Sequence, residues 1–255
     1  MKQKKIWTPG ADADADDPVV DPGRRRLLRL SLGGAAAALL QGCSITSNES
    51  VEAALKRVSR LNDAAQAALF RPQTLAPVFK RSELTLPFRF NAFYSEASVP
   101  EIDEQNWRFK VDGLVRKPGE WTLPELKALP PQTEITRLVC IEGWSAIGQW
   151  TGVPLHHFLK RVGADTSAKY VAFTCADGYY TSIDMASALH PQTMLAFSFN
   201  GSASLPDEFG FPLRLRIPTK LGFKNPKHLT GLAVSNTFTS GYWEDLHGYN
   251  WFAGL

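Results

Sequence analysis

Apolar residues between positions 44 and 70 recur every three or four residues, which is the period of one face of an α-helix. The recurring residues are Val51, Leu55, Val58, Leu61, Ala65 and Leu69. Arg71-Pro72 follows, and a proline disfavours the helical conformation in the residue before it. The pattern therefore predicts an amphipathic helix that ends near residue 70. We expect its apolar face to pack on its own domain, with a partner protein as the alternative.

From Pro72 onward, short apolar runs alternate with prolines and glycines, as in chains built from short strands and turns. The predicted strands are 108–112, 135–140, 169–174 and 212–217, the predicted helices are 122–126 and 154–162, and the strongest hairpin signals are Asp177-Gly178 and Asn200-Gly201. The pattern predicts an α+β fold with mixed, antiparallel-rich sheets and short helices, not a doubly wound parallel sheet.

The first 43 residues have the parts of an export signal. A basic stretch from Arg24 to Arg29 precedes an uncharged run from Leu30 to Gly42, which is shorter than the roughly 20 residues that span a bilayer. Arg24-Arg25 resembles a twin-arginine signal, which exports folded proteins, and residues 40–43, LQGC, resemble a lipobox with Cys43 as the acylated residue. A signal cut elsewhere, or an uncleaved anchor, is the alternative. The expected location is the periplasm, with a lipid anchor in a membrane.

Composition excludes several classes of protein. The net charge of +3 is too small to favour nucleic-acid binding. Hydrophobic residues make up 44% of the chain, so a sizeable core is expected. Three cysteines do not make a disulfide scaffold. The predicted domains are residues 1–43, the export signal with lipobox, residues 44–85, a tether with the amphipathic helix, and residues 86–255, the folded domain.

Cys140 lies in the most unusual stretch of the chain, RLVCIEGWS at residues 137–145. A thiolate at the end of a buried strand can bind a soft metal or act as a nucleophile. Two plainer interpretations remain open, namely a small buried side chain and a disulfide to Cys175. Glu142, two residues on, is a candidate acid or base, or an ordinary loop carboxylate.

An ordered series of segments surrounds and follows this cysteine. The segments are residues 140–145, 150–155, 170–173, 177–179, 195–197, 200–201, 210–215, 218–224 and 241–244. Together they resemble the molybdopterin-binding domain of the sulfite oxidase family, from about Asn91 to the end of the chain. The likeness is nearest to the exported bacterial branch, which includes periplasmic protein-methionine-sulfoxide reductases. The resemblance implies that residues 86–255 have that fold and bind molybdenum-molybdopterin.

The resemblance also implies roles for particular residues. Cys140 matches the cysteine that ligates the metal. Positions that match cofactor contacts are Asn91, Tyr94, Ser95, Cys175, Arg214, Asn225, Pro226 and Lys227. A backbone loop with a lysine suits a phosphate group. Further cations, which could add to this field or be solvated charges, are Arg216, Lys220, Lys224 and His228.

Two positions depart from the family pattern. Cys175 stands where the methionine-sulfoxide branch has a threonine, and Phe209 stands where relatives have Asn or His. Neither side chain can repeat those hydrogen bonds. The substrate pocket is therefore expected to differ from that branch.

Several other aromatic and histidine residues invite a functional interpretation. His156-His157 lies on a predicted helix, where packing is favoured over metal binding. Trp144 and Trp150 could wall a funnel or pack in the core. The aromatic residues near the C-terminus are expected to pin the tail to the domain, with a partner surface as the alternative; they are Tyr242, Trp243, Tyr249, Trp251 and Phe252.

The expected function is that of an exported molybdenum-cofactor oxidoreductase. It would transfer an oxygen atom between water and an S-oxide, an N-oxide or sulfite, with Mo(VI)/Mo(IV) cycling. The chain has no haem or nicotinamide motif, so a membrane haem protein or a cytochrome is the expected electron partner. The alternative is a non-catalytic exported lipoprotein that kept the fold and lost the cofactor, and a Cys140–Cys175 disulfide would favour it.

Overall fold

The computed structural model describes residues 49–255 and divides into two units, residues 1–55 and residues 56–255. The predicted export signal and lipobox lie outside the described residues. Of the first unit, only residues 49–55 are described, and they begin helix α3. Nowhere in residues 49–255 is a helix both long and apolar enough to cross a membrane.

The second unit combines short helices with nine strands. The α-helices are α3 (Glu49–Leu69), α4 (Leu123–Lys127), α5 (Leu155–Val162), α6 (Met185–Ala188) and α7 (Tyr242–His247), and the 3-10 helices are η1 (Arg81–Glu83), η2 (Glu96–Ser98), η3 (Asp207–Phe209) and η4 (Gly222–Lys224). The strands are β1 (Phe109–Gly113), β2 (Gly119–Trp121), β3 (Gln132–Val139), β4 (Ser145–Pro154), β5 (Tyr170–Cys175), β6 (Tyr180–Asp184), β7 (Met194–Phe199), β8 (Arg214–Arg216) and β9 (Leu229–Ser235).

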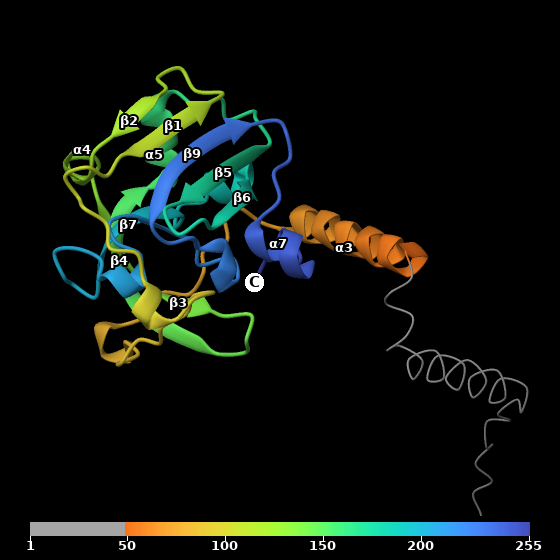
Figure 1. The fold of residues 1–255 in the computed structure, drawn as a ribbon, viewed down its shortest axis with the longest axis horizontal. Helices are drawn as coiled ribbons and strands as arrows, with labels where there is room; N and C mark the ends of the chain where they lie inside the picture. Colours follow the sequence, from red (N-terminus) through yellow and green to blue (C-terminus); the bar gives the residue numbers. More distant parts are fainter. Residues whose placement is uncertain (1–48) are drawn as a thin grey trace, which may run out of the picture. The chain divides into compact units, whose positions relative to one another are not determined.

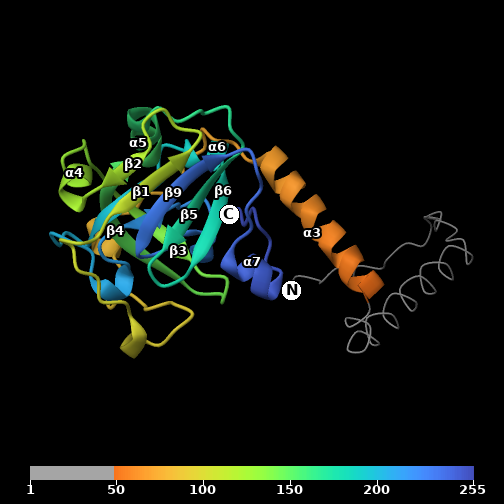
Figure 2. The ribbon, with the colours of Figure 1, turned by 45° about the horizontal axis from the view of Figure 1, so that its top comes forward.

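The strands form two sheets (Figures 1 and 2). One has the order β2-β1-β9-β5-β6 and the other has the order β3-β4-β7-β8. Within the described residues, β1 and β9 are parallel and the other strand pairs are antiparallel. The predicted α+β class with antiparallel-rich sheets is confirmed.

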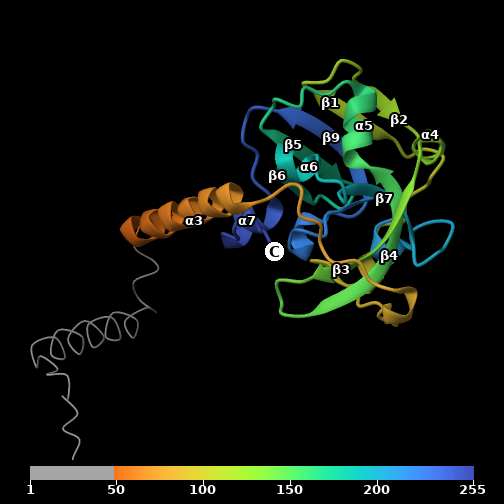
Figure 3. The same ribbon diagram turned by 180° about the vertical axis from the view of Figure 1, so that it is seen from behind.

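Side chains from both sheets form the main hydrophobic core. Phe109 of β1, Val171 of β5 and Leu195 of β7 are fully buried in one cluster. Helix α5 packs against β4 and β7 and adds the buried Phe158 (Figure 3). Burial of each large apolar side chain stabilises the fold by about 1.5–3 kcal/mol. The core therefore joins the two sheets into one framework for the site.

A second core cluster is built on aromatic rings. Phe88 meets Trp150 edge-on at 5.7 Å and Phe209 at 5.4 Å between centroids. Phe199 packs against the same rings. Trp150 is fully buried, so it belongs to the core and does not line a funnel. Phe209 thus fills core space and packs against Phe88 and Phe199.

The local signals at two helices are confirmed. Thr122 caps α4, accepting from the Glu125 N–H, while the Glu125 carboxylate accepts from the Thr122 N–H. Gly163 ends α5 in the left-handed conformation, with φ 66° and ψ 43°. The Asp177-Gly178 turn joins β5 to β6, as predicted for a hairpin.

The prediction of a tight hairpin at Asn200-Gly201 is wrong. Both residues have positive φ, and the turn forms, but the next strand, β8, begins only at Arg214. Asn200 instead bridges to β4, because its Oδ1 accepts a hydrogen bond from the Gln149 N–H at 2.9 Å. The sequence therefore predicted the turn correctly, but the turn does not join two adjacent strands directly.

Strand β8 differs from its alternating pattern. Alternation predicts one solvated face, yet Arg214, Leu215 and Arg216 are all at most 1% exposed. The alternative that Arg216, Lys220, Lys224 and His228 are solvated charges is therefore wrong, since each is at most 1% exposed. Strand β8 therefore buries two arginine side chains in the interior of the domain.

Helix α3 forms as predicted, but the expectation that its apolar face packs on the domain is wrong. Its apolar residues Val58, Leu61 and Leu69 are 54%, 70% and 78% exposed. Polar side chains meet the domain instead, because Asp63 and Gln66 accept hydrogen bonds from the backbone N–H groups of Phe252 and Gly254. Those backbone donors need acceptors, which an apolar face cannot supply.

Gly152 offers a test of the sheet packing. A Cβ at Gly152 would lie 2.1 Å from the Leu195 carbonyl oxygen and 2.5 Å from the Ala196 Cα, at the register shift between β4 and β7. We expect Gly152→Ala to lower the free energy of unfolding by about 3 kcal/mol, because backbone must move. Urea denaturation measures this, with Thr151→Ala as the neighbouring control. Equal stabilities of the two variants would contradict the packing described.

Candidate active site

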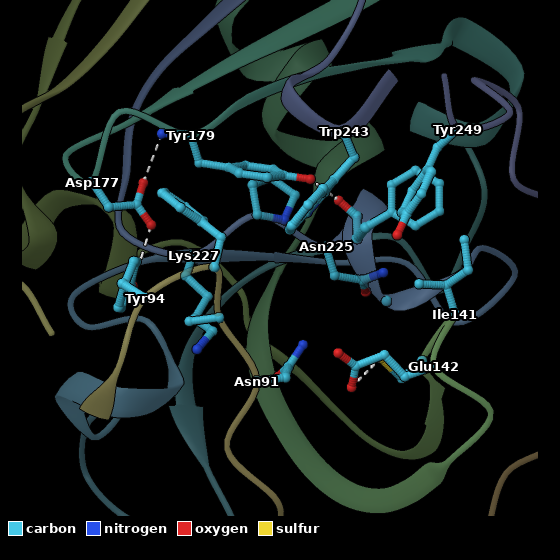
Figure 4. A pocket seen from close by; sticks show the side chains of 16 residues that line it. Asn91, Tyr94, Ile141, Glu142, Asp177, Tyr179, Asn225, Lys227, Trp243 and Tyr249 are labelled. Carbon is cyan, nitrogen blue, oxygen red and sulfur yellow. Dashed lines mark hydrogen bonds between the residues drawn. The ribbon is translucent and has the colours of Figure 1, made fainter. Parts of the chain in front are cut away.

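A cavity lies where the ends of β3 and β5, the loop after η4, and α7 come together. It has a volume of about 120 Å³. Its lining residues are Asn91, Ala92, Phe93, Tyr94, Cys140, Ile141, Glu142, Asp177, Tyr179, Gly222, Phe223, Asn225, Pro226, Lys227, Trp243 and Tyr249 (Figure 4). A neighbouring cavity of about 500 Å³ shares Asn91, Ala92, Tyr94 and Glu142 with it. Space therefore extends from the thiol of Cys140 past Glu142 to the segment 89–96.

Cys140 is placed at the cavity by a tight turn after β3. Its backbone N–H donates to the Trp144 carbonyl at 2.8 Å, and the Gly143 N–H donates to the Cys140 carbonyl at 3.2 Å. Gly143 has φ +87°, a conformation that favours glycine. The turn fixes the direction of the thiol, which is 8% exposed.

The electrostatic environment of Cys140 does not favour a thiolate nucleophile. Burial, and after it the charge of Glu142, raises the pKa of the thiol, with the Glu142 Oε2 3.8 Å from Sγ. Nucleophilic cysteines have lowered pKa values instead. A metal cation can deprotonate such a thiol by coordination. The site therefore suits a metal ligand better than a nucleophile.

Glu142 lines both cavities and faces Cys140. Its Oε2 also accepts a hydrogen bond from Trp144 Nε1 at 2.9 Å. The Arg89 guanidinium lies 4.9 Å from the Trp144 ring centre. Trp144 thus orients the Glu142 carboxylate at the rim of the cavity through this hydrogen bond.

Two cations at the opposite wall have no carboxylate partner in the part of the chain that the structure describes. Arg214 donates to the Phe209 carbonyl at 2.9 Å and lies 4.7 Å from the Trp150 ring centre. Its Nε has no hydrogen-bond partner among the described residues. Lys227 donates to the Glu208 carbonyl at 2.7 Å. Neither charge has a carboxylate within salt-bridge distance, although Asp177 and Glu208 act on Lys227 from farther away. Burying a charge without a close partner destabilises a fold.

The pKa values of Arg214 and Lys227 are both lowered, because burial disfavours their charged forms. Burial, and next the charge of Arg214, lowers the pKa of Lys227 to about 7. Burial lowers the pKa of Arg214 to about 10. By contrast, Lys220 and Lys224 pair with Asp184 and Glu244. Arg214 and Lys227 therefore differ from Lys220 and Lys224 in having no salt-bridge partner among the described residues.

The loop from Gly222 to Lys227 is rigid. The Asn225 Oδ1 accepts from Arg216 Nη1 and from the Ile217 N–H, each at 2.7 Å. The Asn225 Nδ2 donates to the Leu221 carbonyl at 3.1 Å. With its side chain fully used, Asn225 can meet a ligand mainly through its backbone. Pro226 is fixed beside it, since its carbonyl accepts from the Leu215 N–H.

Tyr94 lies in a small polar network. Its hydroxyl is 3.3 Å from Asp177 Oδ2 and 3.1 Å from His228 Nε2, and His228 Nδ1 is 2.8 Å from the Phe211 carbonyl (Figure 4 shows the first contact). Burial lowers the pKa of His228, so the ring is neutral. Nδ1 must then carry the proton that meets the carbonyl, and Nε2 accepts from Tyr94. The phenol proton is thus shared between His228 and Asp177.

Of the predicted site residues, seven line the first cavity: Asn91, Tyr94, Cys140, Glu142, Asn225, Pro226 and Lys227. Ser95 lines the neighbouring cavity. Arg214 lies behind the wall, where its Nη2 donates to the Asn225 carbonyl at 3.3 Å. Cys175 is the last residue of β5, packs in the main core and does not line either cavity.

Cys140 and Cys175 are both free thiols. The disulfide between them, which would have favoured a non-catalytic module, is therefore absent from this structure. His157 is exposed, His156 is partly buried, and no metal-binding cluster of His, Cys, Asp and Glu occurs within residues 49–255.

The cavity also has an aromatic wall that the sequence analysis did not assign. Trp243 and Tyr249 stack at 5.6 Å and an interplanar angle of 15°. Tyr179 donates to the Phe223 carbonyl at 2.6 Å, and burial raises the pKa of its phenol. The aromatic residues near the C-terminus were expected to pin the tail to the domain. Buried Phe252 does so, whereas Trp243 and Tyr249 line the cavity. The sequence feature that could have indicated this is their position in, and shortly after, the segment 241–244, which resembles the family.

Comparison with known proteins identifies the domain. Residues 96–243 match the family model described as the oxidoreductase molybdopterin binding domain. The chain belongs to this family of molybdopterin-binding oxidoreductases. The family and the enzyme class expected from the sequence are confirmed.

Relatives within this oxidoreductase family carry related names. A protein of Azospira oryzae named putative protein-methionine-sulfoxide reductase subunit YedZ1 is 54% identical over 233 residues, which are 91% of this chain and 88% of the relative. The protein-methionine-sulfoxide reductase catalytic subunit MsrP of Ralstonia nicotianae is 30% identical over 88% of this chain and 72% of its own length. MsrP of Xanthomonas campestris is 38% identical over 58% of this chain, and the match spans about half (52%) of that protein.

A solved structure supports the fold of this oxidoreductase. The sulfane dehydrogenase SoxCD of Paracoccus pantotrophus superposes with a TM-score of 0.52 at 24% identity, over 57% of this chain and 42% of that one. At this identity, the likeness establishes the fold alone.

Lys227 provides a test of the buried charge. Its folded pKa is about 7, whereas an unfolded lysine has a pKa of about 10.4. Between these values the unfolded chain holds a proton that the folded chain lacks, so the cofactor-free protein loses stability as the pH falls from about 10 to about 7, and no further below. Lys227→Met removes this loss.

We therefore expect the stability of Lys227→Met relative to wild type to rise as the pH falls through that window. Urea midpoints of the cofactor-free proteins at about pH 9.5 and about pH 6 measure it. The exposed Lys160→Met is the control, and it should show no such trend. A constant difference between Lys227→Met and wild type at both pH values would refute the buried charge.

Proposed function

We propose that this chain binds molybdenum-molybdopterin in the cavity and reduces a neutral sulfoxide, and by the same chemistry an N-oxide. The observation that carries the proposal is that a buried thiol and the buried Lys227 line one cavity, with the buried Arg214 directly behind its wall, and that neither cation has a salt bridge to a carboxylate among the described residues. The family membership and the names of the relatives support it.

The residues present fit this cofactor. Arg214 and Lys227 form no ion pair with a carboxylate among residues 49–255, and the Nε of Arg214 is unsatisfied there. A phosphate would supply the missing negative charge, and the backbone of Asn225 and Pro226 borders the same space. The thiol of Cys140 is a soft ligand, which suits molybdenum.

The bound molybdenum centre would supply two-electron oxygen-atom transfer, and the chain's own groups would do the rest. Cys140 would hold the metal as a thiolate. Lys227 and Arg214 would fix the phosphate end. Tyr94, held by His228, would orient the cofactor edge between them. The rigid loop after η4 keeps these contacts in register without reorganisation.

The reaction consumes protons, since R₂SO + 2H⁺ + 2e⁻ gives R₂S + H₂O. Glu142 is placed to relay one of them from water to the substrate, because its carboxylate lines both cavities 3.8 Å from the Cys140 Sγ and would take up the proton before passing it on. Trp144 holds that carboxylate in place through its Nε1 hydrogen bond. Such proton transfer contributes about 10²–10⁴-fold to a rate.

The charge near Cys140 favours a neutral substrate over sulfite. The groups that line the cavity beside the thiol are the Glu142 carboxylate and an apolar and aromatic wall, which includes Ile141, Phe223, Trp243 and Tyr249. One cation, Arg89, lies near the thiol as well, in the neighbouring cavity and over the Trp144 ring. A sulfite anion would be repelled by Glu142, whereas a thioether-like sulfoxide would pack on the rings. Arg214 and Lys227 lie on the proposed cofactor side and would be neutralised by the phosphate, whereas Arg89 faces the Trp144 ring at the rim.

Export and an electron partner complete the proposal. The twin-arginine pattern at residues 24–29 favours a periplasmic enzyme that folds around its cofactor before export, with acylation at Cys43. Relatives are named as subunits. We take a haem-containing membrane subunit or a cytochrome as the source of electrons.

The direct test is metal content and turnover. Produced in a host that makes the cofactor, the full chain should hold about one molybdenum per chain and reduce a sulfoxide with a viologen donor. Cys140→Ala should lose turnover. Cys175→Ala is the matched control, since Cys175 is also a buried free thiol but does not line the cavity, and it should keep both metal and activity. Wild-type protein without molybdenum would end the proposal.

Substitution of Glu142 tests the substrate argument. Glu142→Gln should lower kcat for sulfoxide reduction by roughly 10²-fold, as for loss of a proton donor. It should also strengthen inhibition by sulfite, since one negative charge is removed, with little change in KM for the neutral sulfoxide. Glu120→Gln on the edge strand β2 is the control. An unchanged kcat together with unchanged sulfite inhibition would contradict both roles.

A further inference from the structure

Helix α3 uses a polar stripe to hold the domain. Within residues 56–69, the Ser59 carbonyl accepts from Asn250 Nδ2 at 3.5 Å and Asp63 Oδ1 accepts from the Phe252 N–H at 2.6 Å. Gln66 Oε1 accepts from the Gly254 N–H at 3.0 Å. The spacing of 59, 63 and 66 is that of one helix face. The helix is therefore bound to the C-terminal segment by specific hydrogen bonds.

An apolar stripe on the same helix is left to solvent. It consists of Val58, Leu61, Ala65 and Leu69, and its three large members are 54%, 70% and 78% exposed. Arg57 and Arg60 are exposed on the remaining face. Apolar side chains at helical spacing with basic residues beside them are typical of helices that lie in a membrane interface.

We propose that α3 lies on a bilayer of anionic phospholipid, with this stripe immersed among the acyl chains and the two arginines among the headgroups. The preceding sequence favours this occupant, because the uncharged run Leu30–Gly42 and Cys43 end only six residues before Glu49. Six residues span at most about 20 Å. Anchoring at or before Cys43 therefore keeps α3 at the membrane surface.

Other occupants fit the stripe less well. A stable protein interface needs about 20–30 residues a side, whereas the stripe presents four. Arg57 and Arg60 are attracted to an anionic surface, whereas a second copy of the same helix would present the same two positive charges. The small size of the stripe, together with Arg57 and Arg60 on the remaining face, thus agrees with a lipid surface.

This contact between α3 and the bilayer would fix the position of the active-site cavity relative to the membrane. The segment that bonds to α3, residues 250–254, directly follows Tyr249, which lines the cavity. This segment is itself tied down, because buried Lys220 donates to the Phe252 carbonyl at 2.7 Å and pairs with Asp184 at 3.2 Å. The orientation goes beyond the proposed sulfoxide chemistry and does not depend on it.

The experiment is site-directed spin labelling of the cofactor-loaded full chain. In a Cys43→Ser background, a label is placed at Leu61→Cys in the stripe or at Ala67→Cys, which is exposed on the same helix outside the stripe. Vesicles of phosphatidylcholine and phosphatidylglycerol are added. The label at 61 should gain oxygen accessibility severalfold and lose accessibility to a water-soluble nickel relaxant. The label at 67 should stay in water.

The comparison of two positions on one helix separates this contact from binding through residues 30–42, which would leave both labels unchanged. Two aqueous labels on vesicle-bound protein would overturn the proposal. Burial of label 61 with a doubled mass and no lipid contact would overturn it in favour of a second copy. The chain with no added cysteine gives the background from Cys140 and Cys175, which are buried.

Discussion

The site depends on positive charge that is buried without a salt bridge to a protein carboxylate. Lys227 lines the cavity and Arg214 lies behind its wall, and burial lowers the pKa of both. A fold does not retain such groups for stability, because an apolar replacement of similar shape is usually as good or better. An anionic ligand that neutralises both charges would explain why they are present. The loop before Lys227 and the aromatic second core beneath Arg214 hold the two side chains in place.

Burial also disfavours the charged form of the Cys140 thiol in the wall of the cavity. Cys140 has a raised pKa and a carboxylate beside it, so by itself it is a weak nucleophile. A bound cation reverses this, because coordination stabilises the thiolate. On the proposed function, Cys140 would hold the metal end of the cofactor and Lys227 its phosphate end, which agrees with the molybdopterin-binding family to which the chain belongs.

Much of this could be predicted from the sequence. The ordered segments brought Asn91, Tyr94, Cys140 and the 225–227 loop to one cavity, as the resemblance implied. The helix at 49–69 followed from its period, but its orientation did not, since periodicity reveals which face is apolar and not what that face meets. The burial of Arg216 on β8 also escaped the pattern, because alternation assumes one wet face.

The most direct measurement of the central claim is X-ray absorption at the molybdenum edge of the loaded full chain. If Cys140 ligates the metal, Cys140→Ser should show one sulfur neighbour fewer than wild type, while Cys175→Ser should match wild type. An identical sulfur shell in wild type and Cys140→Ser would contradict the account.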